Sequence, residues 1–360
     1  MCIRDRSNHV NRVGFGVFSV AFLVFGICIG IERALVGQPM SIRYSGAEGS
    51  TLAVGRARAT GTALVVGTVG GLGCIVVGTN LSGLLGDTLV ATGVVLPFLL
   101  VQDACRLIFF AASRARSAAA NDAVWAVLQL SGVAVLPLLT RPTVPLLVLI
   151  WGGAAAVSAV LALVQLSVLP NPLGAAAWLR EHKDISGYLV AEYLLGTGAF
   201  QGGIVGVGAL VGGDDGLAIV GAFRAAQVVL GPLNMLATAQ QTFALPELSK
   251  RTWLTRRQRT MAAAALSSGL GTVALGYALA LLVMPDAWGE ALFSDSWAGA
   301  RAVLLPLSLG VTARALSEGC AVVIYSMGMA RRTFRVMAIE APLVFTLMIC
   351  LLYTSDAADE

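Results

Sequence analysis

Seven ionisable residues lie inside otherwise apolar stretches, and their types indicate two kinds of chemistry. They are Asp103, Arg106, Glu192, Arg224, Arg314, Glu318 and Glu340. A charge at the centre of a membrane span costs at least ~2.5–3.5 kcal/mol, so such residues normally face a polar interior and serve a purpose. The arginines offer positive charge to an anion such as a pyrophosphate. The carboxylates are candidates for binding a coupling ion.

Two of the charged pairs have helical spacing. Asp103 and Arg106 are spaced i,i+3, and Arg314 and Glu318 are spaced i,i+4, so each pair shares one helix face. Either pair could serve transport, or could neutralise itself and only pack helices. Because Arg106 stands near the end of its apolar stretch, it could also reach the interface.

The remaining charges have no such local partner. A deep unpaired arginine suits a pyrophosphate, so we expect Arg224 to line a cavity. Glu192 and Glu340 could carry protons, or each could neutralise an arginine on another helix.

Several amide side chains lie in the same apolar stretches as these charges. The sequence shows no catalytic or metal-binding pattern. Gln227 and Asn234, with Gln240 and Gln241, could bind sugar hydroxyls or bond one helix to another. The two histidines are far apart, and the six cysteines form no CxxC. We therefore expect no catalytic residue, no metal site, no disulfide framework and no cofactor.

Composition predicts the elements that position these residues. The chain is 57% hydrophobic and 12% charged, with a mean hydropathy of +0.82. A soluble domain has about twice that charged fraction, so we predict an all-α integral membrane protein. The net charge of +4 reflects basic residues in short loops, which argues against a nucleic-acid partner.

The apolar stretches predict about ten membrane spans. We place them at 13–34, 62–85, 88–112, 122–139, 144–169, 187–211, 216–243, 261–284, 302–327 and 336–350. Residues 7–169 form an N-terminal lobe and residues 187–350 a C-terminal lobe, with a cytoplasmic or interfacial linker at 170–186. Trp178 suits the headgroup level in that linker. Residues 1–6 and 351–360 resemble translated sequencing-adapter sequence, and we expect neither to belong to the protein.

Loop charges predict the orientation. Alternate loops carry sixteen basic residues on one side, whereas Arg141 is the clear basic residue in the loops of the other side. The Arg-rich loops are therefore expected to be cytoplasmic. We also expect the glycines at 67, 70, 71 and 73 to serve close helix packing rather than phosphate binding.

A weak internal repeat is also visible. A shift of 207 residues carries Pro39–Arg43 onto Pro246–Lys250, both at the cytoplasmic exit of a span. The same shift carries the first four spans close to the last four. This spacing predicts two pseudo-repeated six-helix lobes, with the first and last helix missing from the chain.

Two segments resemble a known family. The segments LPFLLVQDACR at 96–106 and AANDAVW at 119–125 are similar to the third-to-fourth span region of bacterial polysaccharide exporters. FRAAQVVLGPLN at 223–234 and its LPEL exit resemble the same proteins. These exporters are flippases of the multidrug/oligosaccharidyl-lipid/polysaccharide exporter superfamily, which includes O-antigen-type translocases.

The resemblance implies two six-helix lobes around a cavity that opens alternately to each side of the bacterial inner membrane. The implied cargo is a polyprenyl-pyrophosphate-linked oligosaccharide, and coupling to H⁺ or Na⁺ is common in the superfamily. One alternative is a drug/cation antiporter of the same fold, against which Arg224 and Arg314 argue. Another is a membrane-embedded polysaccharide polymerase or ligase. Such enzymes usually carry a long outer loop with catalytic Arg or His, and the longest outer loop, 285–299, has neither.

Overall fold

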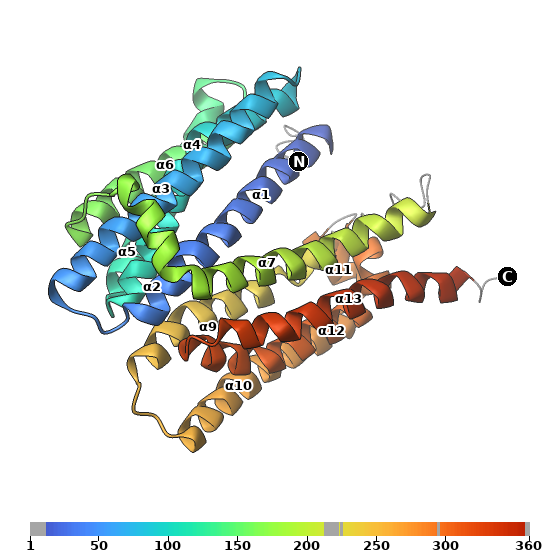
Figure 1. Ribbon diagram of the computed structural model, residues 1–360. Helices are drawn as coiled ribbons and strands as arrows, with labels where there is room; N and C mark the ends of the chain where they lie inside the picture. The colour runs from blue at the N-terminus through green and yellow to red at the C-terminus, as the bar shows by residue number, and fades with distance from the viewer. Residues whose placement is uncertain (1–11, 212–222, 224–225, 294–295, 357–360) are drawn as a thin grey trace. The chain divides into compact units, whose positions relative to one another are not determined.

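The protein is built from helices, as the prediction of an all-α chain requires (Figure 1). The structure is a computed structural model that describes residues 12–211, 223, 226–293 and 296–356, and no strand occurs among them. The chain divides into two compact units, Met1–Val190 and Ala191–Glu360. The boundary falls within one long helix, α7.

Unit 1 begins with three consecutive helical segments and continues through an array of long helices. The elements are α1 (Arg12–Glu32), η2 (Arg33–Gly37), α2 (Gln38–Arg43), α3 (Gly49–Thr79), α4 (Leu84–Ala111), α5 (Ala115–Leu139), α6 (Val144–Leu166), the 3₁₀ turn η3 (Pro172–Gly174) and the first part of α7 (Ala175–Val211).

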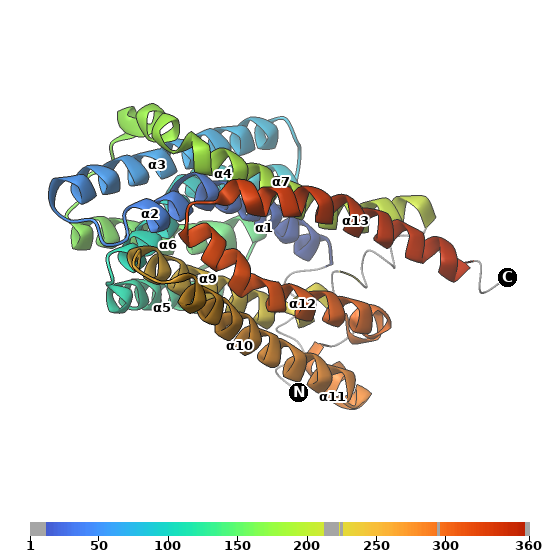
Figure 2. The ribbon, with the colours of Figure 1, turned by 60° about the horizontal axis from the view of Figure 1, so that its bottom comes forward.

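Unit 2 contains the end of α7 and a second array. Its further elements are α9 (Gly231–Lys250), α10 (Arg256–Leu282), α11 (Asp286–Phe293), α12 (Ser296–Ser326) and α13 (Ala330–Asp356). Within this unit α10 and α12 lie side by side (Figure 2).

The chain is a multi-pass membrane protein. Seven described helical stretches are long and apolar enough to cross a bilayer, each within 20–43, 49–79, 84–111, 115–139, 144–166, 256–282 or 303–326. Large apolar side chains cover much of their outer surface. Leu138 and Leu139 of α5, for example, are 81% and 79% exposed. In water such a surface would be unfavourable, whereas in a bilayer it meets lipid chains.

Glycines let the long helices approach closely. A Cβ added at Gly71 of α3 would lie 2.4 Å from the Gly93 carbonyl oxygen of α4, and one at Gly67 would lie 2.6 Å from the Pro97 Cα. Small residues at such positions let two backbones touch in a membrane. The packing role expected for Gly67 and Gly71 is confirmed, whereas Gly73 faces open space.

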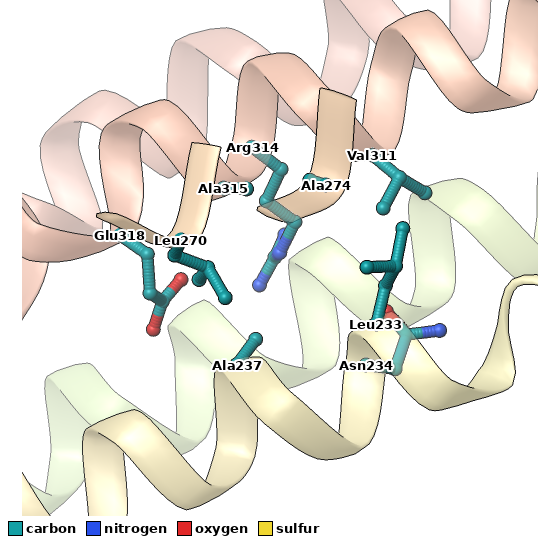
Figure 3. A pocket seen from close by; sticks show the side chains of 9 residues that line it. All are labelled: Leu233, Asn234, Ala237, Leu270, Ala274, Val311, Arg314, Ala315 and Glu318. Atoms are coloured by element: carbon teal, nitrogen blue, oxygen red, sulfur yellow. The ribbon is translucent and has the colours of Figure 1, made fainter. Parts of the chain in front are cut away.

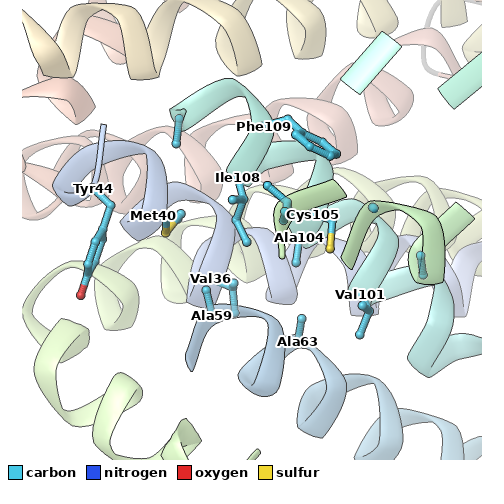
Figure 4. Close-up of a cluster of buried hydrophobic side chains, with 14 of the residues drawn as sticks. Val36, Met40, Tyr44, Ala59, Ala63, Val101, Ala104, Cys105, Ile108 and Phe109 are labelled. Carbon is cyan, nitrogen blue, oxygen red and sulfur yellow. The ribbon is translucent and has the colours of Figure 1, made fainter. Parts of the chain in front are cut away.

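The core of unit 1 forms where η2 and α2 meet α3 and α4. Val36 and Met40 pack there with Ala59 and Ile108, and all four are fully buried (Figure 4). This arrangement corrects one expectation. The first span was placed at 13–34, with Pro39–Arg43 at its exit, but the helix continues through the π-helical turn η2 and ends at Arg43.

Two further helix boundaries differ from the prediction. The fourth span was placed at 122–139, whereas α5 begins at Ala115, so Asp122 lies inside the helix and accepts a hydrogen bond from Gln102 at 3.0 Å. The linker expected at 170–186, with Trp178 at the headgroup level, contains the beginning of α7. Trp178 is completely buried there against Tyr44 and His182, not at a lipid interface.

Helix ends agree with the internal repeat. The shift of 207 residues carries Arg43, the last residue of α2, onto Lys250, the last residue of α9. It also carries Gly49, the first residue of α3, onto Arg256, the first residue of α10.

Candidate functional site

Unit 2 contains a small pocket between three of its helices (Figure 3). α9 contributes Asn234, and α12 contributes Arg314 and Glu318. The rest of the wall is apolar and consists of Leu233, Ala237, Leu270, Ala274, Val311 and Ala315. The enclosed free volume is about 20 Å³, enough for about one water molecule.

Arg314 supplies the positive charge of this pocket. Its guanidinium points from α12 toward α9, and Glu318 lies one turn further along the same face (Figure 3). None of the salt bridges among the described residues of unit 2 involves Arg314. The i,i+4 spacing therefore places both charges at one pocket without closing them into a direct ion pair.

A buried carboxylate lies close to this pocket. Glu192 of α7 accepts a hydrogen bond from the Tyr325 hydroxyl of α12, and another from the Thr333 hydroxyl of α13 at 2.8 Å. Its charge interacts with those of Arg314 and Glu318. These contacts connect α7 to α12, which lines the pocket, and to α13.

Unit 1 contains a separate cluster of charges where α1 and η2 meet α4. The Asp103 side chain is 3% exposed and accepts two hydrogen bonds from Arg33, Nε to Oδ2 at 2.7 Å and Nη2 to Oδ1 at 2.9 Å. Arg106 donates a further hydrogen bond to Oδ1. Beside them Glu32 is completely buried. The predicted pair of Asp103 and Arg106 is thus part of a four-residue arrangement.

The other predicted residues do not line the pocket. Gln227 is half-buried in the segment before α9, and Glu340 is exposed on α13. Arg224 lies outside the described residues.

Sequence reasoning missed several residues at these sites. Glu32 and Arg33 stand at the end of the span placed at 13–34 and were not counted among the charges within spans, so their contact with Asp103 was not foreseen. Tyr325 and Thr333 carry no charge, and no sequence signal distinguishes them from other hydroxyl residues. The one available clue was the adjacency of Glu32 and Arg33 at the end of a strongly apolar stretch.

Comparison with known proteins gives a fold and no family. No protein-family model matches the chain, and no curated protein matches it. Among solved structures, the chain is similar to a multidrug resistance MATE family transporter of the MOP superfamily in an outward-facing conformation. The TM-score is 0.60 at 12% identity, over 95% of this chain and 88% of that one. The chain therefore has the fold of that transporter.

Proposed function

We propose that this chain transports a polyprenyl-pyrophosphate-linked oligosaccharide across the bacterial inner membrane by alternating access, with its Arg-rich loops in the cytoplasm. The observation that carries the proposal is the Arg314 guanidinium, which stands without a salt bridge to any described residue in a largely apolar pocket. Such a cation attracts a pyrophosphate and repels a cationic drug.

The pocket supplies two of the proposed substrate contacts. Arg314 would bind the pyrophosphate, while the Asn234 amide, on the facing helix, would bind a sugar hydroxyl. The space of about 20 Å³ admits no sugar, so α9 and α12 would separate when substrate enters. Alternating access involves a rearrangement of that kind.

Further contacts to the substrate are proposed from the sequence. Arg224 and Gln227 precede α9 in the chain and belong to this proposed set. Arg106 belongs to it as well, although it already donates to Asp103 and would have to exchange that bond for a phosphate.

The carboxylates are proposed to couple transport to H⁺ or Na⁺. Glu192 and Glu318 interact electrostatically with one another and with Arg314. An ion bound between the carboxylates would therefore alter the field at Arg314, and this supports a link between ion and substrate. Glu340 acts on Glu192 through its charge alone, and Asp103 is the corresponding candidate of unit 1.

A drug/cation antiporter is the second candidate, and the fold of the multidrug transporter favours it. In that case Glu318 and Glu192 would bind the cationic substrate directly, and Arg314 would restrain them. The two functions predict opposite effects when the arginine is neutralised.

The deciding experiment reconstitutes the protein in liposomes and follows a fluorescent polyprenyl-pyrophosphate oligosaccharide crossing the bilayer. We expect Arg314→Gln to reduce translocation at least tenfold, while Arg256→Gln, at the exposed start of α10, leaves it unchanged. If wild type moves no lipid-linked sugar under either ion gradient but extrudes a fluorescent cation, the flippase proposal is wrong. Faster cation extrusion by Arg314→Gln would then support the antiporter.

A further inference from the structure

Glu32 is an unusual residue because its two carboxyl oxygens are buried and accept no hydrogen bond from the described residues. The side chain is completely buried at the end of α1. In the described part of the chain, no N–H or O–H group donates to either of its carboxyl oxygens. An ionised carboxylate in that position would lose its hydration without replacement, which strongly disfavours the charged form.

The neighbouring carboxylate, that of Asp103, is well supplied with hydrogen-bond donors. Asp103 accepts three hydrogen bonds from Arg33 and Arg106, two at Oδ1 and one at Oδ2. A carboxylate offers about four acceptor positions, so Oδ2 retains one. The Glu32 carboxyl interacts directly with this Asp103 carboxylate.

A proton on Glu32 would supply the donor that the free acceptor position on Asp103 lacks. Its O–H would then donate to the free position on Asp103 Oδ2, and both groups would have partners. The Asp103 carboxylate disfavours a second negative charge on Glu32, whereas the two arginines favour it, so burial and the lack of a donor among the described residues carry the assignment.

We infer that Glu32 is a proton-binding site in unit 1, and that the bound proton is shared with Asp103. On release, the Glu32 O–H bond breaks, the proton passes to water and the electron pair stays on the carboxylate. The side chains of Arg33 and Arg106 are 28% and 22% exposed, so the cluster reaches the surface on its cationic side.

The cluster also contains a group that could stabilise the deprotonated state. Arg106 Nε is buried and has no hydrogen-bond partner among the described residues. When Glu32 loses its proton, this N–H is an unused donor on a residue whose charge already acts on Glu32, and Arg106 would turn from Asp103 toward Glu32. Proton loss would thus replace an ion pair within α4 by one between α4 and α1.

Few other groups act on Glu32. Among the described residues, the charged groups that influence it are Arg33 on its own helical run, and Asp103 and Arg106 on α4. The Cys105 thiol of α4 lies within electrostatic range as well. The coupling role of this proton rests on the proposed transport function. Proton binding by Glu32 does not depend on that function.

Infrared spectroscopy tests proton binding without any transport. The purified full chain in lipid is compared with Glu32→Gln, which keeps the size and polarity of a protonated glutamate. We expect wild type to show the carbonyl band of a protonated buried carboxyl, and the band of one such group to disappear in Glu32→Gln. Glu48→Gln, on the exposed residue before α3, should retain it. If the carboxyl bands of wild type and Glu32→Gln are identical, Glu32 holds no proton and the inference is wrong.

Two further measurements complete the test. Glu32→Asp keeps a carboxyl, so we expect its band to shift rather than vanish, even if Glu32→Gln folds poorly. In liposomes that translocate lipid-linked oligosaccharide, a pH gradient should accelerate wild type and not Glu32→Gln. Undiminished acceleration in Glu32→Gln would overturn the coupling role. Absence of translocation by wild type would instead refute the proposed function and leave the infrared result standing.

Discussion

The indole Nε1 of Trp178 donates a hydrogen bond to the carbonyl oxygen of Leu35, at 2.9 Å. In a regular α-helix this carbonyl would accept from the residue four positions later, which is Pro39 and has no N–H. The helix passes this point through the π-helical turn η2. A residue 143 positions away in sequence thus satisfies a carbonyl that the proline leaves without its helical donor.

Loss of this donor should destabilise unit 1. Trp178→Phe keeps most of the buried ring but removes the indole donor, and the Ser186 hydroxyl lies 3.5 Å from the Leu35 carbonyl oxygen, which is too long for a strong bond. We expect a loss of about 1–3 kcal/mol in unfolding free energy, measured as a lower melting temperature in detergent. Trp253→Phe, at a 73% exposed position, is the control. Equal melting temperatures for the two variants would contradict this role of Trp178.

The long apolar helices could be predicted from sequence because hydropathy alone defines them. The third and fifth spans were placed at 88–112 and 144–169, and the helices are Leu84–Ala111 and Val144–Leu166. Residues 32–43 could not be predicted in the same way. Pro39 is a strong local signal for a helix end, and the group that compensates for it, Trp178, is distant in sequence.

The α3–α4 contact should tolerate no added methyl group at Gly71. Gly71→Ala would place a Cβ 2.4 Å from the Gly93 carbonyl oxygen, and a backbone oxygen cannot rotate away. Overpacking of this kind costs about 1–3 kcal/mol, so we expect a lower melting temperature.

The matched control lies two residues further along the same helix. Gly73→Ala meets open space and improves helix propensity, so we expect its melting temperature to be equal to or above that of wild type. Should Gly71→Ala prove as stable as Gly73→Ala, the close approach of α3 to α4 at this point is wrong.

The hydrogen bond from Thr333 to Glu192 should contribute to the stability of unit 2. Thr333→Val has nearly the same shape but removes the hydroxyl that donates to Glu192 at 2.8 Å. Hydrogen bonds to charged groups contribute about 1.5–3 kcal/mol, and we expect a corresponding fall in melting temperature. Thr242→Val, whose hydroxyl donates to the Thr238 carbonyl oxygen within α9, should change little. A similar response from both variants would show that the bond to Glu192 adds nothing.

The pocket shows what sequence can and cannot predict about a site. The i,i+4 spacing correctly placed Arg314 and Glu318 on one helix face. That Asn234 faces them depends on how α9 packs on α12, and these spans are too uniformly apolar to reveal which face turns inward. For the same reason no pattern connected Glu32 with Asp103, whose partnership exists only through the contact of α1 with α4.

His182 predicts a pH dependence of stability in unit 1. It precedes the expected span at 187–211 and is completely buried, and its Nδ1–H donates to the Trp178 carbonyl oxygen at 2.8 Å. Its Nε2 has no partner among the described residues. Burial lowers the pKa of His182 below its ordinary value of 6.5, with the nearby Arg43 contributing in the same direction.

Because the folded pKa is lowered, the unfolded chain binds the proton more readily. The stabilisation from neutral His182 is therefore complete above pH 6.5 and is lost as the pH falls through the folded-state value. We expect the melting temperature of wild type to decline below pH 6.5, and His182→Gln to show a weaker decline. Exposed carboxylates titrate mainly at lower pH, so they serve as an internal reference. If the melting temperatures of wild type and His182→Gln fall in parallel between pH 7.5 and about 5.5, the pKa of His182 does not change on folding and the prediction is wrong.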